Sequence, residues 1–507
     1  MQQLSELDAS FLYLESETTP MHIGGVYLFD ASGLETPVSY ATFVNFLCSR
    51  LHVAPIFRQK LKEIPLRLGR PYWVDDAEFS IERHLAYVSL GDAGKQTCIN
   101  SLAAKILEEP LKRDRPLWHI TFVDGFKLDS SDGDKDGFAL IVKLHHASID
   151  AFSGEEIMGK LLEYTPAPRA INPPHPWQAR PEPSEERVFL QAGANILKAP
   201  IQFASLAYNT VEATARGLIQ KQIHKLPLPT SLFTAPYCPF NQQITGNRKI
   251  VSASVELSRL KTIKAQLGDV TLNDVVLGIC AEALNRYLNT QGEKSTKSLV
   301  AMTPISVRSS SLRRATGNQM SAMLLNLATN ETDPAIRIRR IHHNAVETES
   351  YREAIAADRL TELLPSTLLA LSARLYSEFR VAQRYQPLFN LPITNVPGPQ
   401  VPMYLQGAKL VQQHNSAPLF DSMGLVIVAV SYEGMVTLNF TLCPDVAPDG
   451  ASLEGLVYDS LEAIEMQAEA AGAAIIDDAS PNSKGLTNDI FSYLENLLKK
   501  RPLRFKR

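Results

Sequence analysis

Two adjacent histidines, His145 and His146, are followed by an aspartate, Asp150, at the spacing His-x-x-x-Asp. Imidazole titrates near neutral pH, so it can take a proton from an alcohol or a thiol while a new bond forms. An aspartate nearby can hold the ring or a backbone turn in one orientation. The pattern indicates general-base catalysis, although a pair of this kind also occurs as a purely structural feature.

The histidine pair is expected to lie where a strand passes into a loop. Residues 137–142 form an apolar run of the length of a buried strand, and residues 154–164 are expected to form a helix with one apolar face. Reactive side chains are often placed at such junctions, because the strand fixes the position while the loop leaves the side chain accessible.

A second histidine pair, His342 and His343, has an acidic residue, Glu347, at the same offset. It lies in a charged stretch in which apolar residues recur at helical spacing. We expect a solvated helix face there, without catalysis.

The composition is that of a globular protein, with 45% hydrophobic and 21% charged residues and a net charge of −4. At 507 residues, two domains are expected. The charge argues against general nucleic-acid binding. The five cysteines are scattered without metal-binding spacing, which fits a reducing cytoplasm. No signal peptide or membrane-spanning run is evident, so a lipid substrate would be reached from the water side.

Prolines divide the chain. Seven of them crowd residues 166–183, and a helical region and a loop rich in Pro and Thr follow. The expected organisation is an N-terminal domain (1–165), a Pro-rich and helical connector (166–247), a C-terminal domain (248–475) and a tail (476–507).

The second half alternates strands and helices, which indicates an α/β or α+β fold. We expect a strand at 249–255, a helix from Leu272 capped reciprocally by Thr271 and Asp274, and a strand at 299–307. Residues 391–400 are expected to be an irregular loop, and residues 426–442 a hairpin around Glu433 and Gly434. The sequence has no GxGxxG, P-loop or HExxH motif, which weighs against nucleotide or zinc chemistry.

The tail has an apolar helical face over residues 490–498, followed by six basic residues and no acid over 499–507. Such an end can lie on an anionic membrane or lipid surface. A helix docked on the protein with a frayed basic end is the alternative.

Taken together, several motifs resemble those of the bacterial wax ester synthase/acyl-CoA:diacylglycerol acyltransferase family, in order along nearly the whole chain. Position 151 departs from the family pattern HHxxxDG, because it is alanine where the family has glycine. The matching stretches are Leu7-Asp8-Ala9-Ser10-Phe11, Thr19-Pro20-Met21-His22-Ile23-Gly24, Arg115-Pro116-Leu117-Trp118, the histidine motif, Asn273-Asp274-Val275-Val276, Pro304-Ile305-Ser306-Val307-Arg308, Gly317-Asn318-Gln319 and Asn395-Val396-Pro397-Gly398-Pro399.

The resemblance implies two domains similar to chloramphenicol acetyltransferase, each a mixed sheet with flanking helices, and a tunnel between them. It implies transfer of a long acyl chain from acyl-CoA to a fatty alcohol or to diacylglycerol, at a membrane or lipid-droplet surface. Acyl-CoA is then a substrate, and neither a cofactor nor a metal is required. The candidate residues for binding it are Thr303, Ser306, Arg308 and Asn395.

On this reading His146 is the general base, and His145 shapes the site. Asp150 orders the loop, and Asn273, at a helix N-terminus, donates to the oxyanion. Two alternatives remain: an acyltransferase of the same superfamily that uses a carrier-protein-bound acyl group, and a non-catalytic protein that binds lipid droplets.

Overall fold

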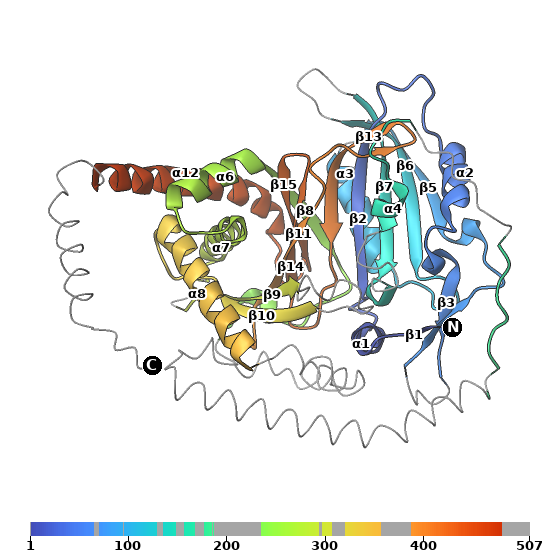
Figure 1. Cartoon of the computed structure of the whole chain (residues 1–507), viewed down its shortest axis with the longest axis horizontal. Helices are drawn as coiled ribbons and strands as arrows, with labels where there is room; N and C mark the ends of the chain where they lie inside the picture. Colours follow the sequence, from blue (N-terminus) through green and yellow to red (C-terminus); the bar gives the residue numbers. More distant parts are fainter. Residues whose placement is uncertain are drawn as a thin grey trace, which may run out of the picture.

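The structure is a computed structural model, and it describes residues 2–64, 70–94, 96–128, 135–148, 157–167, 177–184, 186, 235–293, 297–306, 320–355 and 387–478. Two six-stranded sheets form its centre (Figure 1). They lie next to each other, with strand β13 (Ala408–Ser416) beside β14 (Leu425–Tyr432) and β15 (Met435–Leu442). This mixed arrangement of strands and helices confirms the predicted fold class.

The first sheet has the order β12-β13-β2-β7-β6-β5 and carries the histidine pair on β7 (Lys135–His145). Neighbouring strands are antiparallel except for β5 and β6, which are parallel. Its other strands are β12 (Tyr404–Leu405), β13, β2 (His22–Asp30), β6 (Trp118–Leu128) and β5 (Leu85–Gly94).

Both faces of the first sheet are covered, which explains why β7 reads as a continuous apolar run. Alternate residues of a strand point to opposite faces. Phe138, Leu140 and Val142 therefore enter the core shared with helix α2 (Tyr40–Arg50). Ala139 and Ile141 enter the core shared with α3 (Gln96–Glu108).

The second sheet has the order β10-β9-β11-β14-β15-β8. Its strands outside the β14–β15 hairpin are β8 (Lys249–Glu256), β9 (Val300–Ser306), β10 (Met320–Asn326) and β11 (Leu391–Pro397). Four helices gather on one side of this sheet (Figure 1): α6 (Leu257–Leu267), α7 (Leu272–Thr290), α8 (Pro334–Ile355) and α12 (Leu453–Asp478). A small third sheet joins β1 (Gln2–Gln3), β4 (Tyr72–Asp75) and β3 (Gln59–Lys62).

Several local predictions are confirmed. Strands occupy the expected places at β7, β8 and β9. The hairpin of β14 and β15 turns at Glu433 (φ 44°) and Gly434 (φ 80°), the two positive φ values that suit a tight hairpin. Helix α7 begins at the predicted cap, where the Asp274 carboxylate accepts from the Thr271 amide at 2.7 Å.

Residues 391–400 were expected to be an irregular loop, and this was wrong. Leu391 to Pro397 form strand β11, which lies in the sheet between β9 and β14 and is parallel to both. Leu391 and Ile393 are buried in the main core of the C-terminal half. The prolines gave the misleading signal: Pro392 lies where β11 pairs only briefly with β9, and Pro397 is the last strand residue.

The expected helix at 154–164 is described only from residue 157, and it ends early. Helix α4 covers Ile157–Leu161. Glu163 then forms an isolated bridge with Tyr404 and a buried ion pair of 2.6 Å with Arg50. These contacts hold the chain extended at Glu163, where the spacing of apolar residues had predicted that the helix would continue.

The chain order does not divide the sheets cleanly at residue 248. Strands β12 and β13 belong to the C-terminal half of the sequence, yet β13 pairs with β2 at the edge of the first sheet. Most of the expected connector (166–247) and the tail from residue 479 lie outside the described residues.

Candidate active site

The histidine pair lies at the end of β7, as expected. His145 is the last residue of β7, and His146 begins a 3₁₀ turn, η4 (His146–Ser148). Strand β2 runs antiparallel to β7 and places His22 opposite His145. The His146 amide donates to the Met21 carbonyl at 2.8 Å, so the chain just before β2 holds the turn in place.

His146 lies against an aromatic ring. The rings of His146 and Phe11 stack with centroids 3.7 Å apart at 24°. Nδ1 of His146 is buried and has no hydrogen-bond partner from another described residue. Burial disfavours the imidazolium and lowers the pKa of His146 to about 3. The ring is therefore neutral at neutral pH, which is the state that can accept a proton.

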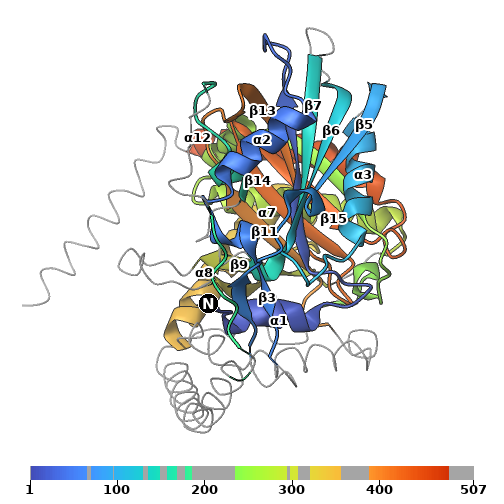
Figure 2. The same cartoon turned by 90° about the vertical axis from the view of Figure 1, so that its right-hand side faces the viewer.

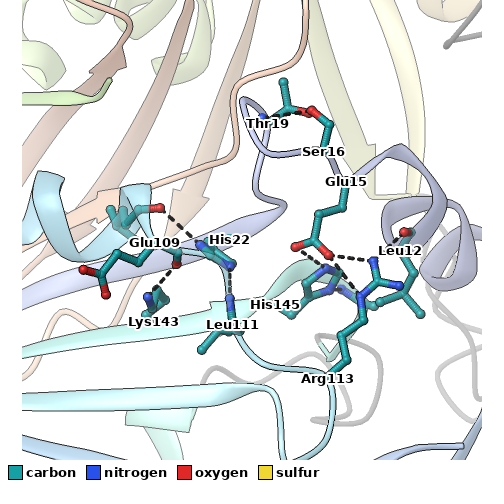
Figure 3. Close-up of polar contacts among 12 residues, drawn as sticks. Leu12, Glu15, Ser16, Thr19, His22, Glu109, Leu111, Arg113, Lys143 and His145 are labelled. Carbon is teal, nitrogen blue, oxygen red and sulfur yellow. Dashed lines mark hydrogen bonds and ion pairs between the residues drawn. The ribbon is translucent and has the colours of Figure 1, made fainter. Parts of the chain in front are cut away.

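His145 is almost fully buried, with 1% exposed, and is hydrogen-bonded through one of its ring nitrogens. Its Nδ1 accepts a hydrogen bond from the Ala147 amide at 3.0 Å. Its Nε2 faces the Glu15 carboxylate, 3.5 Å from Oε1. Arg113 in turn donates to Oε2 of Glu15, from Nη2 at 2.6 Å and from Nε at 3.1 Å (Figure 3).

Helix α1 (Glu6–Leu14) brings Phe11 and Glu15 to the histidines. Ser5 caps the helix by accepting from the Asp8 amide at 3.0 Å, and Glu15 is the C-cap residue. The helix crosses the end of the first sheet and packs against η4 (Figures 1 and 2). Residues four apart share one face of a helix, so a single helix end reaches both rings.

A second buried cluster, formed around His22 and Lys143, supports the same ends of β2 and β7. His22 Nδ1 donates to the Leu107 carbonyl and Nε2 accepts from the Leu111 amide, each at 3.2 Å. Burial, with the charge of Lys143, lowers the pKa of His22 to about 3. Lys143 donates to the Ile106 and Glu109 carbonyls at the end of α3, and burial lowers the pKa of Lys143 to about 8.

Two further predicted residues lie together on the second sheet. Asn395 on β11 donates from Nδ2 to Oδ1 of Asn273, the second residue of α7, at 3.0 Å. Both side chains are exposed. Thr303 lies instead on β9, buried, with its hydroxyl toward the Met323 carbonyl at 3.4 Å.

The remaining predicted residues cannot be placed by side chain. Ser306 ends β9, but its side chain is outside the description. Asp150, Arg308 and the alanine at position 151 lie outside the described residues. Within the described part of the chain, no group of three or more His, Cys, Asp or Glu side chains is arranged to hold a metal ion.

Comparison with known proteins decides the family. The model of the wax ester synthase/diacylglycerol acyltransferase catalytic domain matches residues 4–276, and that of the C-terminal domain of the same family matches residues 316–465. This chain belongs to the wax ester synthase/diacylglycerol acyltransferase family. It is an acyltransferase of that family.

Individual relatives agree with this assignment. A probable diacylglycerol O-acyltransferase of Mycobacterium tuberculosis is 31% identical over 469 residues, which cover 90% of this chain and 97% of the relative. The O-acyltransferase WSD of Acinetobacter baylyi is 28% identical over 458 residues, covering 88% and 93%.

Solved structures also match. The wax ester synthase/diacylglycerol acyltransferase of Marinobacter aquaeolei VT8 is 26% identical, with a TM-score of 0.66 over 92% of this chain and 100% of that one. The starter condensation domain of rhizomide synthetase is 12% identical, with a TM-score of 0.53 over 92% of this chain and 94% of that one. This second match shows a shared fold alone.

Sequence reasoning about the site missed Glu15 and Arg113, and it left Phe11 without a role. Phe11 and Glu15 are four apart in a capped helix, which predicts a common face. That this face meets the histidines follows only from the packing of α1 on η4. The second histidine pair was predicted to be solvated, and this holds only for His343, which is exposed. His342 contacts Asp274 at 2.8 Å and so joins α8 to the cap of α7.

The buried neutral histidines predict a loss of stability in acid. Burial lowers the pKa of His414 to about 4, as it lowers that of His22 to about 3. The unfolded chain takes up these protons near pH 6.5, so stability is complete above pH 6.5 and falls as the pH drops toward 4. The slope is about 1.4 kcal/mol per pH unit for each histidine.

Denaturant titrations between pH 7 and 4.5 measure this slope. The glutamine in His22→Gln keeps a donor and an acceptor but cannot titrate. The slope of the free energy of unfolding against pH should therefore be smaller in this variant by about 1.4 kcal/mol per pH unit. His343→Gln, on the exposed face of α8, is the matched control and should leave the slope unchanged. An unchanged slope in His22→Gln would contradict a neutral His22.

The two neighbours Asn273 and Asp274 should separate stability from turnover. Asp274 is buried, closes the cap of α7 and contacts His342, so Asp274→Ala should lower the free energy of unfolding by about 1–3 kcal/mol. Asn273 is exposed, so Asn273→Ala should change stability by less than about 0.5 kcal/mol. If Asn273 donates to the oxyanion, Asn273→Ala should lower kcat on the order of a hundredfold.

Thermal melts and initial rates at saturating substrate, measured for both variants, make the comparison. An Asn273→Ala variant that melts early and turns over normally would show that this residue is structural.

Proposed function

We propose that this protein transfers a long acyl chain from acyl-CoA to the hydroxyl of a fatty alcohol or of diacylglycerol, with His146 as the general base. The observation that carries the proposal is the state of His146: a neutral ring, set by stacking and burial, with no partner from another described residue on Nδ1. The names of the relatives, wax ester synthase and diacylglycerol O-acyltransferase, support this choice of acceptors.

The proposed reaction needs one base for two proton transfers. The acceptor oxygen attacks the thioester carbonyl carbon while its proton passes to His146, because an alcohol is too weak an acid to ionise first. The tetrahedral intermediate then collapses, the carbon–sulfur bond breaks, and His146 returns the proton to the CoA sulfur. The products are an ester and free CoA. The thioester is already activated, so no cofactor is needed.

The low pKa of His146 suits the return of the proton. An imidazolium in this buried position is unstable relative to the neutral ring, so His146 passes the proton on to the thiolate instead of keeping it. Stacking on Phe11 limits rotation of the ring, so the imidazole is oriented before substrate arrives.

We assign the oxyanion donor to Asn273 and the ordering of the loop after the histidines to Asp150. Asn395 already donates to Oδ1 of Asn273, which leaves the Nδ2 of Asn273 as the group able to donate. Its position in the first turn of α7 adds the positive end of the helix dipole. Thr303, Ser306, Arg308 and Asn395 are the candidate contacts for acyl-CoA.

His146→Ala tests the proposal directly. Removing the base should lower kcat by roughly two to four orders of magnitude, with little change in melting temperature. The assay is CoA release with purified protein over a panel of alcohols and diacylglycerol, with the lipid product identified. His343→Ala, in the second histidine pair, is the control and should retain full activity.

Near-normal turnover by the His146→Ala variant would refute the assignment. The same assay addresses the acyl donor, because turnover with acyl-CoA alone shows that no carrier protein is needed. Absence of turnover by the unaltered protein with every acceptor, together with coating of lipid droplets, would favour a non-catalytic lipid-binding role.

We also propose that the protein reaches its lipid substrates from the cytoplasm as a peripheral protein on membranes or lipid droplets, through the tail. No helix in the described part of the chain is long and apolar enough to cross a membrane. Residues 490–507, outside the described residues, combine an apolar face with six basic residues. Such a segment binds anionic surfaces in a salt-dependent way.

Deleting residues 490–507 should weaken binding to anionic vesicles in a flotation assay, while turnover of short soluble alcohols survives. Raising the ionic strength should weaken binding of the full chain. The matched control replaces only the six basic residues of 499–507 with glutamine, which keeps the apolar face. Equal vesicle binding by the deletion variant and the full chain would favour a docked C-terminal helix.

A further inference from the structure

The end of helix α1 meets both histidines of the site at once. Phe11 stacks on His146, and Glu15, four residues later, faces His145 across 3.5 Å. The Glu15 side chain is only 11% exposed. A buried carboxylate this near the site needs an explanation, because an unpaired buried charge is strongly unfavourable.

The hydrogen bonds of His145 fix where its proton lies. Nδ1 accepts from the Ala147 amide, so Nδ1 must carry a lone pair. With Nδ1 unprotonated, the ring proton lies on Nε2, and Nε2 lies 3.5 Å from Oε1 of Glu15, beyond the usual length of a hydrogen bond. The partner of one ring nitrogen thus decides what the other nitrogen can do.

Glu15 is kept as an acceptor by Arg113. Burial raises the pKa of Glu15, but the contact with His145 and the two hydrogen bonds and the charge of Arg113 outweigh burial and lower that pKa. Arg113 contacts only Oε2 of Glu15, and its Nη2 also donates to the Leu12 carbonyl of α1. Oε1 is therefore left facing His145 (Figure 3).

We propose that Glu15 is a positioning residue for acyl transfer: it holds His145 in the Nε2–H tautomer, so that Nδ1 accepts the Ala147 amide and fixes the turn that carries His146. This rests on the proposed role of His146 as base. The other tautomer would place an N–H against the Ala147 N–H, and the two donors would repel each other. Turn η4 would then shift, and His146 would move away from its place on Phe11.

Glu15→Gln is the informative substitution, because it keeps the shape of the side chain and changes one donor. Arg113 still requires an oxygen at the Oε2 position, so the amide nitrogen of glutamine faces Nε2 of His145. That N–H favours the Nδ1–H tautomer. We expect kcat to fall about tenfold to a hundredfold, with little change in the KM for acyl-CoA or in melting temperature.

The double variant Glu15→Gln/Arg113→Met supplies a rescue. Without Arg113, the glutamine amide can rotate and present its oxygen to Nε2 of His145. The kcat of the double variant should therefore return to that of Arg113→Met alone, in which the Glu15 carboxylate still faces Nε2 of His145. A residue that only filled space or stabilised α1 would show no such recovery. Glu63→Gln is the matched control, since exposed Glu63 contacts the same Arg113 at 3.2 Å without touching His145; it should leave kcat unchanged.

The tautomer itself is read by nitrogen-15 NMR of histidine-labelled protein, with His145 assigned from its loss in a His145→Phe variant. The unaltered protein should show the Nε2–H form, and Glu15→Gln the Nδ1–H form. This readout needs no turnover, so it fails or succeeds independently of the role of His146.

Three results would overturn the proposal: an unaltered protein in the Nδ1–H form, a Glu15→Gln variant with normal kcat, or a double variant no faster than Glu15→Gln. If Glu15→Gln does not fold, the tautomer of His145 in the unaltered protein decides: the Nε2–H form supports the proposal and the Nδ1–H form overturns it.

Discussion

The antiparallel pairing of β2 with β7 is the constraint on which the rest of the site depends. It sets His22 opposite His145 and brings the Met21 carbonyl under the His146 amide. The two strands lie very close together at Gly24, where a Cβ would lie 2.5 Å from the Val142 carbonyl oxygen. Any larger residue would push the strands apart two pairs from the histidine. Because α1 ends only a few residues before β2, the same pairing directs the end of α1 onto the histidine turn.

Burial of charge in this region follows one rule: the buried ions have polar partners, and burial keeps His22 and His146 neutral. Glu15 is matched by Arg113, and Lys143 by the carbonyls that end α3. His22 uses one ring nitrogen as donor and the other as acceptor, as only the neutral ring can. A neutral imidazole among matched charges suits the general-base role that we propose for His146, because that role requires the ring to take up a proton and release it again.

Local chemistry made much of the fold predictable, and long-range packing made the rest unpredictable. The cap of α7 needs only Thr271 and Asp274, three residues apart, and was found. The β14–β15 turn needs only Glu433 and Gly434, and was found too. Strand β11 was missed because its place between β9 and β14 depends on residues about 35 to 90 positions away, while its prolines indicate a loop locally. Glu15 was missed for the same reason, since it meets His145 across 130 residues of chain. The histidine motif could be recognised because it is local, whereas the contacts that position His146 join residues far apart in the sequence.

The two histidine pairs show why a motif is not yet a site. In both, two histidines are followed by an acidic residue at one spacing. In helix α8, His342 contacts Asp274 and exposed His343 contacts Glu347 at 3.1 Å, so each imidazole is held by a carboxylate. At the end of β7 the strand turns consecutive side chains to opposite sides, and the two rings separate in role. His145 takes the carboxylate of Glu15, and His146 is left against Phe11. Among the described residues, carboxylates thus contact both rings in helix α8, but only that of His145 at the end of β7.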